Sequence, residues 1–326
     1  MHDVARQAGV SQMTVSRVMR GRGYISDTIR ARVTEAADQI GYVHNRLAGA
    51  GPGYDNPLVG VILPTLQNRV FTEVMSGIND TLESLEMRPV FGVTEYLPEA
   101  EEKIAIDLLK WRPKGLILTG LEHADRFRSM IEKTGVRTVE IMDIDGEPID
   151  ACVGISHMAA GRAMAQHFLE RGHLKVAYVA SADGRDLRAA KRFEAFAETL
   201  TQGGGSLIEQ RITQGASSMP IGQQVTSELL RKHKGLQAVY FSNDDLAGGG
   251  LLHCMASAIH VPGDVALAGF NGLNFLDAFP KRLTTTRTPR YQIGQEAAKI
   301  IASPGGPNKH GKRVDLEAEL FVGDTT

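Results

Sequence analysis

A short polar run near the N-terminus carries side chains that suit the edges of DNA bases. The amide of Gln12 matches adenine, the guanidinium of Arg17 matches guanine, and Met13 can contact a thymine methyl group. The hydroxyls of Thr14 and Ser16 suit phosphate oxygens, which position a protein on DNA without specifying sequence. This chemistry requires a short helix that presents these side chains outward.

The flanking residues predict such a helix within a helix-turn-helix. Gly9 stands where a first helix must end, and Ser11 follows as the N-cap of a second helix. Apolar residues recur at helical spacing and would pack the two helices together: Val4, Ala5, Ala8, Val15 and Val18. The second helix would then enter the major groove. The alternative is a helical hairpin in an ordinary core, whose polar face is merely solvated.

The distribution of charge favours DNA binding at this end of the chain. Residues 1–46 carry seven arginines against four acidic residues, a net charge of +3, although the whole chain has a net charge of −2. A basic head on an acidic body fits phosphate attraction confined to one end. Because +3 is modest, we expect specific binding to need a dimer. Further candidates for phosphate contacts are Arg20, Arg22, Asn45 and Arg46.

A third helix is predicted over residues 27–40, with Ser26 as its cap, Gly41 at its end and Tyr42 packing back. The Gly/Pro-rich tract at 48–53 then indicates a flexible linker. The expected domains are an all-α headpiece, a hinge and a core: 1–46, 47–57 and 58–326.

The core alternates short apolar runs with amphipathic helices. The expected strands are 59–63, 89–93, 115–118, 137–141, 151–155, 175–179, 238–241 and 265–270, and the expected helices include 71–86, 159–171, 185–199 and 244–258. This βαβ pattern predicts parallel sheets covered on both faces. Its length predicts two lobes, about 58–155 and 156–285, with C-terminal segments recrossing.

A ligand of such a fold binds beyond the carboxyl ends of the strands, in the cleft between the lobes. Polar and aromatic residues that follow the first and third expected strands are the candidates there: Gln67, Asn68, Phe71, Thr119, Glu122 and His123.

Other classes of site receive little support. Cys152 and Cys254 make no disulfide framework, and the ten histidines form no metal pattern. Gly248–Gly250 lacks the spacing of a phosphate-binding motif, so close helix packing is the better interpretation. No apolar run approaches membrane-spanning length and no signal peptide opens the chain, so we expect a reduced, cytoplasmic protein without a membrane partner.

Two segments closely resemble the headpiece of the lactose-repressor (LacI/GalR) family of bacterial transcription regulators. They are Asp3-Val4-Ala5-x-x-Ala8-Gly9-Val10-Ser11 and Thr14-Val15-Ser16-Arg17-Val18. Residues 171–178, 241–247, 268–272 and 283–285 resemble further family segments, so the resemblance covers essentially the whole chain. It implies base reading by Gln12, Met13 and Arg17. It also implies a dimerising core of the periplasmic-binding-protein-like type I fold, with the chain recrossing near 285–290.

Three departures from the family concern the headpiece and hinge. The family has several residues before the equivalent of Asp3, which indicates a shortened start here, and it commonly has proline at the position of His44. Many members insert a hinge leucine into the minor groove, where this chain has Gly51 followed by Pro52. Glycine and proline oppose a hinge helix, so the sequence predicts that insertion of the hinge into the minor groove is weakened in this chain.

The resemblance also assigns ligand contacts. Arg192, Asn243 and Asn271 align with the ligand-binding positions of the family, where Asn271 replaces the common aspartate. A guanidinium binds a carboxylate through two hydrogen bonds and amides bind hydroxyls, so this set suits a sugar acid. Residues 118–123, 140–143, 153–157 and 287–290 resemble the gluconate-repressor branch, which adds Ser156 as a candidate.

The expected function is therefore a non-enzymatic repressor of sugar-acid metabolism. It would bind double-stranded operator DNA as a homodimer, need no cofactor, and respond to gluconate or another aldonate. A sugar-binding protein of a transport or sensing system is the alternative, but it predicts a signal peptide and no headpiece. A nucleotide-dependent enzyme predicts a glycine motif after the first strand, where the chain reads Pro64-Thr65-Leu66-Gln67-Asn68.

Overall fold

The computed structural model describes residues 1–20, 23–42, 56–181, 186–307 and 311–326. The chain divides into two units, Met1–Asp55 and Asn56–Thr326. The expected phosphate contacts at Arg22, Asn45 and Arg46, His44 and the Gly51-Pro52 hinge lie outside the described residues.

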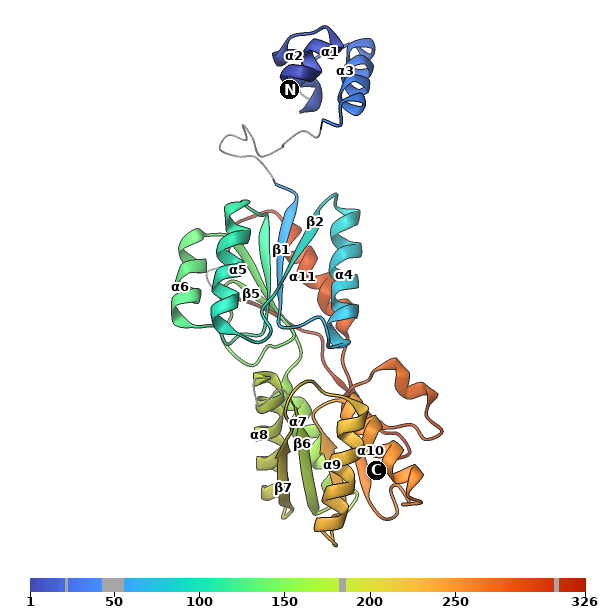
Figure 1. Ribbon diagram of the computed structural model, residues 1–326. Coiled ribbons are helices and arrows are strands. Elements are labelled where there is room, and N and C mark those ends of the chain that lie inside the picture. The colour runs from blue at the N-terminus through green and yellow to red at the C-terminus, as the bar shows by residue number, and fades with distance from the viewer. Residues whose placement is uncertain (21–22, 43–55, 182–185, 308–310) are drawn as a thin grey trace. The chain divides into compact units, whose positions relative to one another are not determined.

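The first unit contains three short helices (Figure 1): α1 (His2–Ala8), α2 (Gln12–Met19) and α3 (Asp27–Gln39). Gly9 ends α1 with φ 59°, a left-handed conformation that glycine adopts at little cost. Ser11 caps α2 by accepting a hydrogen bond from the Thr14 amide at 3.1 Å. Both expectations are confirmed. Ser26 occupies the N-cap position of α3, but its side chain makes no capping hydrogen bond.

The apolar faces of these helices form one small core. Val4, Val15 and Val33 are completely buried in it, and Tyr42 packs against it as expected. Arg32 of α3 donates a hydrogen bond from Nη2 to the Ala8 carbonyl at 2.5 Å. That contact satisfies an acceptor at the end of α1 and ties α3 to the turn.

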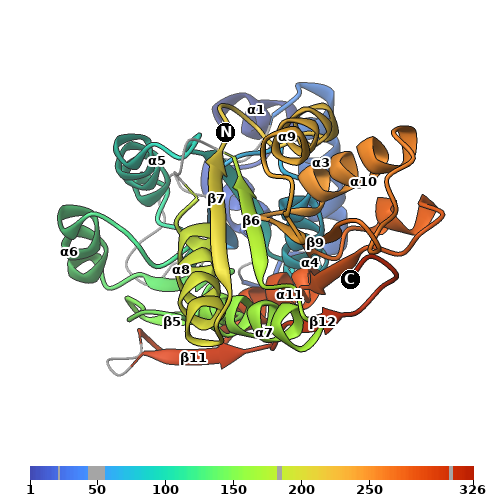
Figure 2. The same ribbon diagram turned by 90° about the horizontal axis from the view of Figure 1, so that it is seen from below.

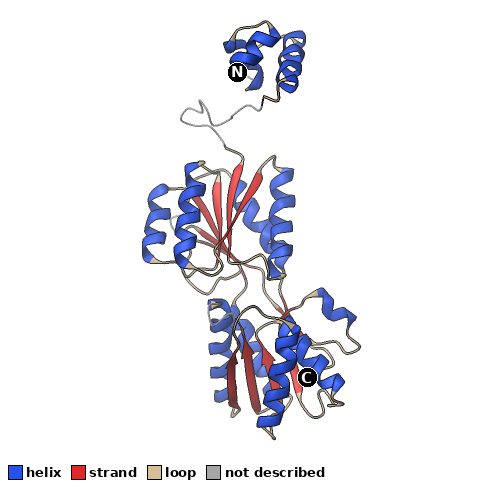
Figure 3. Ribbon diagram, in the orientation of Figure 1, coloured by secondary structure: helices blue, strands red, loops and turns tan. Residues whose placement is uncertain are grey.

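The second unit contains two lobes, each built on one six-stranded sheet between two layers of helices (Figure 3). The sheet of the first lobe has the order β11-β5-β4-β3-β1-β2, and all its paired strands are parallel. Its strands are β1 (Leu58–Leu63), β2 (Arg88–Val93), β3 (Gly115–Thr119), β4 (Arg137–Ile141), β5 (Ala151–Gly154) and β11 (Lys312–Asp315). Its helices are α4 (Val70–Ser84), α5 (Pro98–Lys110), α6 (Asp125–Thr134) and α11 (Arg290–Ala302). Helices α4 and α11 pack on one face, and α5 and α6 pack on the other.

The sheet of the second lobe has the order β12-β10-β9-β8-β6-β7, in which β12 is antiparallel to β10. Its strands are β6 (Lys175–Ala180), β7 (Ser206–Ile212), β8 (Ala238–Phe241), β9 (Ala266–Asn271), β10 (Thr284–Arg287) and β12 (Glu319–Phe321). Its α-helices are α7 (His157–Glu170), α8 (Leu187–Gln202), α9 (Met219–Lys232) and α10 (Asp244–Ala256), and a 3-10 helix spans Asn274–Ala278. Figure 2 shows α7 and α8 on one side of the sheet and α9 and α10 on the other.

The chain crosses between the lobes from β5 to α7, from β10 to α11 and from β11 to β12. The expected two-lobed α/β fold with parallel sheets is therefore confirmed. None of the helices in the described ranges is long and apolar enough to cross a membrane.

Candidate functional site

The α2 helix presents the expected polar face. Gln12, Met13 and Arg17 are exposed, and Met13 keeps 64% of its surface accessible despite being apolar. An exposed methionine beside an amide and a guanidinium is suited to contact with base edges. Thr14 and Ser16 are half-buried, and the hydroxyl of Thr14 lies 3.0 Å from that of the capping residue Ser11.

Arg20 follows α2 as its C-cap residue and is exposed, so its guanidinium is free to reach a phosphate. The described part of the headpiece therefore carries two exposed arginines, Arg17 and Arg20, at the end of α2.

A cavity of about 640 Å³ opens between the two lobes. Gln67 and Asn68, from the loop before α4, line it from the first lobe. Asn243, from the start of α10, lines it from the second lobe together with several serine hydroxyls. We call this cavity the outer chamber. Its walls offer amides and hydroxyls, which suit a ligand rich in hydroxyl groups.

A smaller cavity of about 40 Å³, the deep pocket, shares Asn68, Asp186 and Asn243 with the outer chamber. Three of the residues expected at the ligand site line it as well: Phe71, Arg192 and Asn271. The structure therefore brings Gln67, Asn68, Phe71, Arg192, Asn243 and Asn271 together around two cavities that share lining residues.

Arg192 is almost completely buried at the wall of the deep pocket, with 3% of its surface exposed. Its Nη2 donates to the Ser242 carbonyl at 2.9 Å, and its Cζ lies 3.6 Å from the centre of the Phe270 ring. The aromatic face favours a cation in this position. Its Nε is buried and has no hydrogen-bond partner among the described residues.

A second arginine adds positive charge to the deep pocket. Arg188 lies on the same helix as Arg192, one turn earlier, and its Nε is 3.4 Å from Oδ1 of Asp186. Burial alone would raise the pKa of Asp186, but the cations of Arg188 and Arg192 outweigh it and lower this pKa. Asp186 is therefore ionised, and the described residues of the pocket supply two cations and one carboxylate.

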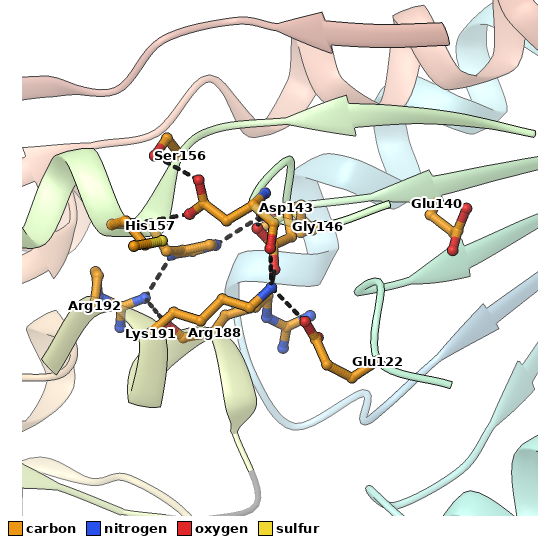
Figure 4. A network of polar contacts seen from close by, with 12 residues as sticks. Glu122, Glu140, Asp143, Gly146, Ser156, His157, Arg188, Lys191 and Arg192 are labelled. Atoms are coloured by element: carbon orange, nitrogen blue, oxygen red, sulfur yellow. Dashed lines mark hydrogen bonds and ion pairs between the residues drawn. The ribbon is translucent and has the colours of Figure 1, made fainter. Parts of the chain in front are cut away.

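An ion pair joins the lobes beside the deep pocket (Figure 4). Nζ of Lys191, on α8, lies 2.6 Å from Oδ2 of Asp143, which follows β4. It also contacts the carboxylate of Glu122. Burial lowers the pKa of Lys191, but the hydrogen bonds to Asp143 and Glu122 outweigh this effect and raise it, so the lysine stays charged.

Four expected ligand residues do not line the outer chamber or the deep pocket. Thr119 donates a hydrogen bond to the Ile62 carbonyl at 3.1 Å. Glu122 pairs with Lys191. Ser156 caps α7 and donates to Asp145 at 2.7 Å, so its hydroxyl is engaged in holding the crossover between the lobes.

His123 is the clearest correction. Its side chain is 1% exposed, with Nδ1 3.0 Å from Glu101 and Nε2 3.4 Å from Glu140. These carboxylates come from α5 and β4, and they hold the imidazole inside the first lobe rather than in the cleft. We therefore interpret His123 as a stabilising group and not as a ligand contact.

Several residues of the site were not selected from the sequence: His157, Arg188, Lys191 and Asp143. The sequence did contain indications of these four residues. His157 and Asp143 lie in segments that resemble the gluconate-repressor branch, and the two cations lie on the same expected helix as Arg192. A search of that helix for further cations would have found Arg188 and Lys191.

Comparison with known proteins settles the family. Residues 1–45 match the family model of bacterial regulatory proteins of the lacI family, and residues 56–316 match that of periplasmic binding proteins and the sugar binding domain of the LacI family. The chain belongs to the LacI family. It is a DNA-binding transcriptional regulator, with the helix-turn-helix in its first unit and the ligand-binding fold in its second.

Relatives match this chain over nearly its full length. The HTH-type transcriptional regulator GntR of Pseudomonas aeruginosa is 34% identical over 100% of this chain and 95% of its own. A crystal structure of a LacI family transcriptional regulator from Silicibacter pomeroyi is 45% identical, with a TM-score of 0.94 over 99% of this chain and 98% of its own. The lac repressor dimer bound to operator shares the fold, with a TM-score of 0.80 at 24% identity over 99% of this chain and 98% of its own.

Proposed function

We propose that this regulator is a repressor whose affinity for operator DNA is set by a sugar acid, gluconate or another aldonate, in the cleft between the lobes. It acts as a homodimer, and each α2 helix reads one half-site in the major groove. To release DNA, the sugar acid must bind the DNA-incompetent state more tightly than the DNA-competent one. The regulator itself performs no catalysis in this account.

The separation of charge along the cleft is the observation that carries the proposal. The deep pocket has Arg188 and Arg192 against Asp186. Among the residues that the structure describes, the outer chamber is lined by three carboxylates and one cation: Glu95, Asp186, Asp245 and Arg69. One carboxylate is therefore attracted to the deep pocket, and a second anionic group in the chamber would be repelled.

The sizes of the two cavities fit the same arrangement. The deep pocket, at about 40 Å³, has room for a group of about three water-sized atoms, which is the size of a carboxylate. The outer chamber is larger and polar, so it can hold a chain of hydroxyls. Asn271 supports this placement because it contributes no negative charge beside the carboxylate. The resemblance to the gluconate-repressor branch points to the same ligand.

Isothermal titration calorimetry with three ligands tests the proposal. Gluconate has one carboxylate, glucose has none and glucarate has one at each end. We expect gluconate to bind at least about tenfold more tightly than either of the others, a difference of about 1.4 kcal/mol. Glucose binding as tightly as gluconate would refute the role of the carboxylate. Glucarate binding as tightly would refute the repulsion in the outer chamber.

A further inference from the structure

His157 joins the two lobes at the deep pocket (Figure 4). Its Nε2 lies 2.8 Å from the carbonyl oxygen of Met142, in the first lobe. Its Nδ1 lies 2.8 Å from Nη1 of Arg192, in the second lobe. The imidazole is buried and also lies against the Phe270 ring, with the ring centres 5.8 Å apart.

These two partners fix where the proton of the imidazole resides. A carbonyl oxygen only accepts hydrogen bonds, and a guanidinium only donates them. His157 must therefore donate from Nε2 and accept at Nδ1, which is the neutral Nε2–H tautomer. Burial first, and then the cations of Arg192 and Arg188, lower the pKa of His157 well below its usual value, while Asp186 opposes them.

The backbone of the first lobe holds the Met142 carbonyl in place. Met142 has φ 76°, in the left-handed region that residues other than glycine rarely adopt. Its amide donates to the Val153 carbonyl at 2.9 Å. A Cβ at Gly154 would lie 2.7 Å from the Met142 carbonyl carbon, so the neighbouring strand approaches this closely only because it has glycine there.

Further contacts of Arg192 lie within the second lobe. Its Nη2 is held by the Ser242 carbonyl and its face by Phe270, both in the second lobe. Nη1 is shared between His157 and a longer contact of 3.4 Å to the Arg188 carbonyl. Through His157, therefore, the guanidinium is connected to the backbone of the other lobe.

We propose that His157 is a positioning residue that couples sugar-acid binding to the arrangement of the lobes, by tethering Arg192 to the Met142 carbonyl. The contact of His157 with Arg192 aligns the guanidinium toward the ligand carboxylate, and the contact of His157 with Met142 makes this alignment depend on the arrangement of the lobes. The inference rests on the proposed function, in which that carboxylate contacts Arg192.

Two substitutions in the full-length protein separate the contact of His157 with Arg192 from its contact with Met142. His157→Gln keeps a donor near the Nε2 position but loses the acceptor for Arg192. His157→Asn keeps an acceptor near the Nδ1 position but does not reach Met142. The exposed His260→Gln is the matched control. For each variant we would measure gluconate affinity by calorimetry, operator affinity with and without gluconate, and the unfolding temperature.

We expect His157→Gln to weaken gluconate binding by at least about tenfold and His157→Asn to change it by less than about threefold. In His157→Asn the ratio of operator affinities without and with gluconate should fall toward one. If both variants bind gluconate and respond to it as the wild type does, the proposal is overturned. Equal loss in both variants, together with a lower unfolding temperature, would show a merely structural role and also overturn it.

A measurement on the protein without ligand tests the His157 contacts independently of the proposed function. The ¹⁵N NMR shifts of His157 in the free wild-type protein should show a neutral ring protonated at Nε2. A ring protonated at Nδ1, or at both nitrogens, contradicts the tether whatever the ligand. If wild-type protein binds no gluconate but shows the Nε2–H ring, the proposed ligand is wrong and the tether stands.

Discussion

The ammonium of Lys191 lies 2.6 Å from the carboxylate of Asp143 on the opposite lobe. Lys191 also donates to the Asp145 carbonyl at 2.8 Å and contacts Glu122. The side chain of Asp143 is completely buried, whereas that of Lys191 is 19% exposed. The ion pair and the His157 tether therefore fasten α8 to the same loop after β4, and both must rearrange when the lobes move.

Substituting Lys191 tests this fastening. Lys191→Met leaves the carboxylate of Asp143 buried without its cation, so we expect a loss of about 3 kcal/mol in the free energy of unfolding. Adding Asp143→Asn should recover part of the loss. Lys110→Met is the matched control, because Lys110 is exposed and pairs with Asp107 within α5. Urea denaturation gives the free energy of unfolding of the wild type, the two single variants and the double variant. If Lys191→Met lost no more stability than Lys110→Met, the role of the Lys191–Asp143 pair would be contradicted.

His123 predicts a pH dependence of stability. Burial alone lowers its pKa, but the hydrogen bond with Glu101 and the nearby carboxylate of Glu140 outweigh burial and raise the pKa to about 9. Because this exceeds the unfolded value of 6.5, protonated His123 stabilises the fold fully below pH 6.5, and the contribution is lost as the pH rises to 9. The full effect is on the order of 3 kcal/mol.

Urea denaturation between about pH 6.5 and 8.5 checks this prediction. The wild type should lose stability across the window, and His123→Gln should lose much less. His260→Gln is the control, because His260 is exposed. If the free energy of unfolding fell equally steeply with pH in the wild type and in His123→Gln, another group would be responsible for the pH dependence.

Glycine at position 249 is required by helix packing. A Cβ there would lie 2.0 Å from the Met219 carbonyl oxygen of α9, whereas at Gly248 its nearest neighbour would be a Phe275 ring carbon at 3.3 Å. We expect Gly249→Ala to destabilise the protein by about 3 kcal/mol or more, because the backbone of α9 must move. Gly248→Ala should cost less than about 1 kcal/mol. Thermal unfolding compares the two, and equal effects would contradict the packing argument.

Arg17 is expected to read a base. Arg17→Ala should weaken operator binding by about 1–3 kcal/mol and relax specificity at one base pair of each half-site. Arg126→Ala, at an exposed position of α6, should leave binding unchanged. Competition between operator variants measures both effects. Uniform weakening across all variants would instead assign Arg17 to a phosphate.

Local signals explain how much of the fold could be predicted. Gly9 and Ser11 mark the turn by backbone and capping chemistry that need no distant partner. The strands β1 and β3 are apolar runs, as is typical of buried parallel strands. By contrast, β7, β10, β11 and β12 were not expected. The strands β10, β11 and β12 have only three or four residues, and β7 is partly polar. Pairing with neighbours defines them, as β11 shows beside β5.

The cleft could be predicted less completely. Arg192 and Asn243 follow from the family resemblance and line the deep pocket, and their contact with a ligand stays a prediction. The partners of His157 and Lys191 could not be found in this way, since Met142 and Asp143 belong to the other lobe and contact these side chains only after the lobes dock. His123 was misplaced for a different reason: its carboxylate partners come from α5 and β4 of its own lobe, which approach it only when that lobe folds.

The central claim is that a sugar acid controls DNA binding. Its most direct test is the fluorescence anisotropy of a labelled palindromic site from upstream of the gene, first with the protein alone and then with gluconate or glucose added. The account predicts tight binding that gluconate reverses and glucose does not. No binding even at low salt would contradict the DNA-binding assignment, and binding that gluconate leaves unchanged would contradict the proposed control.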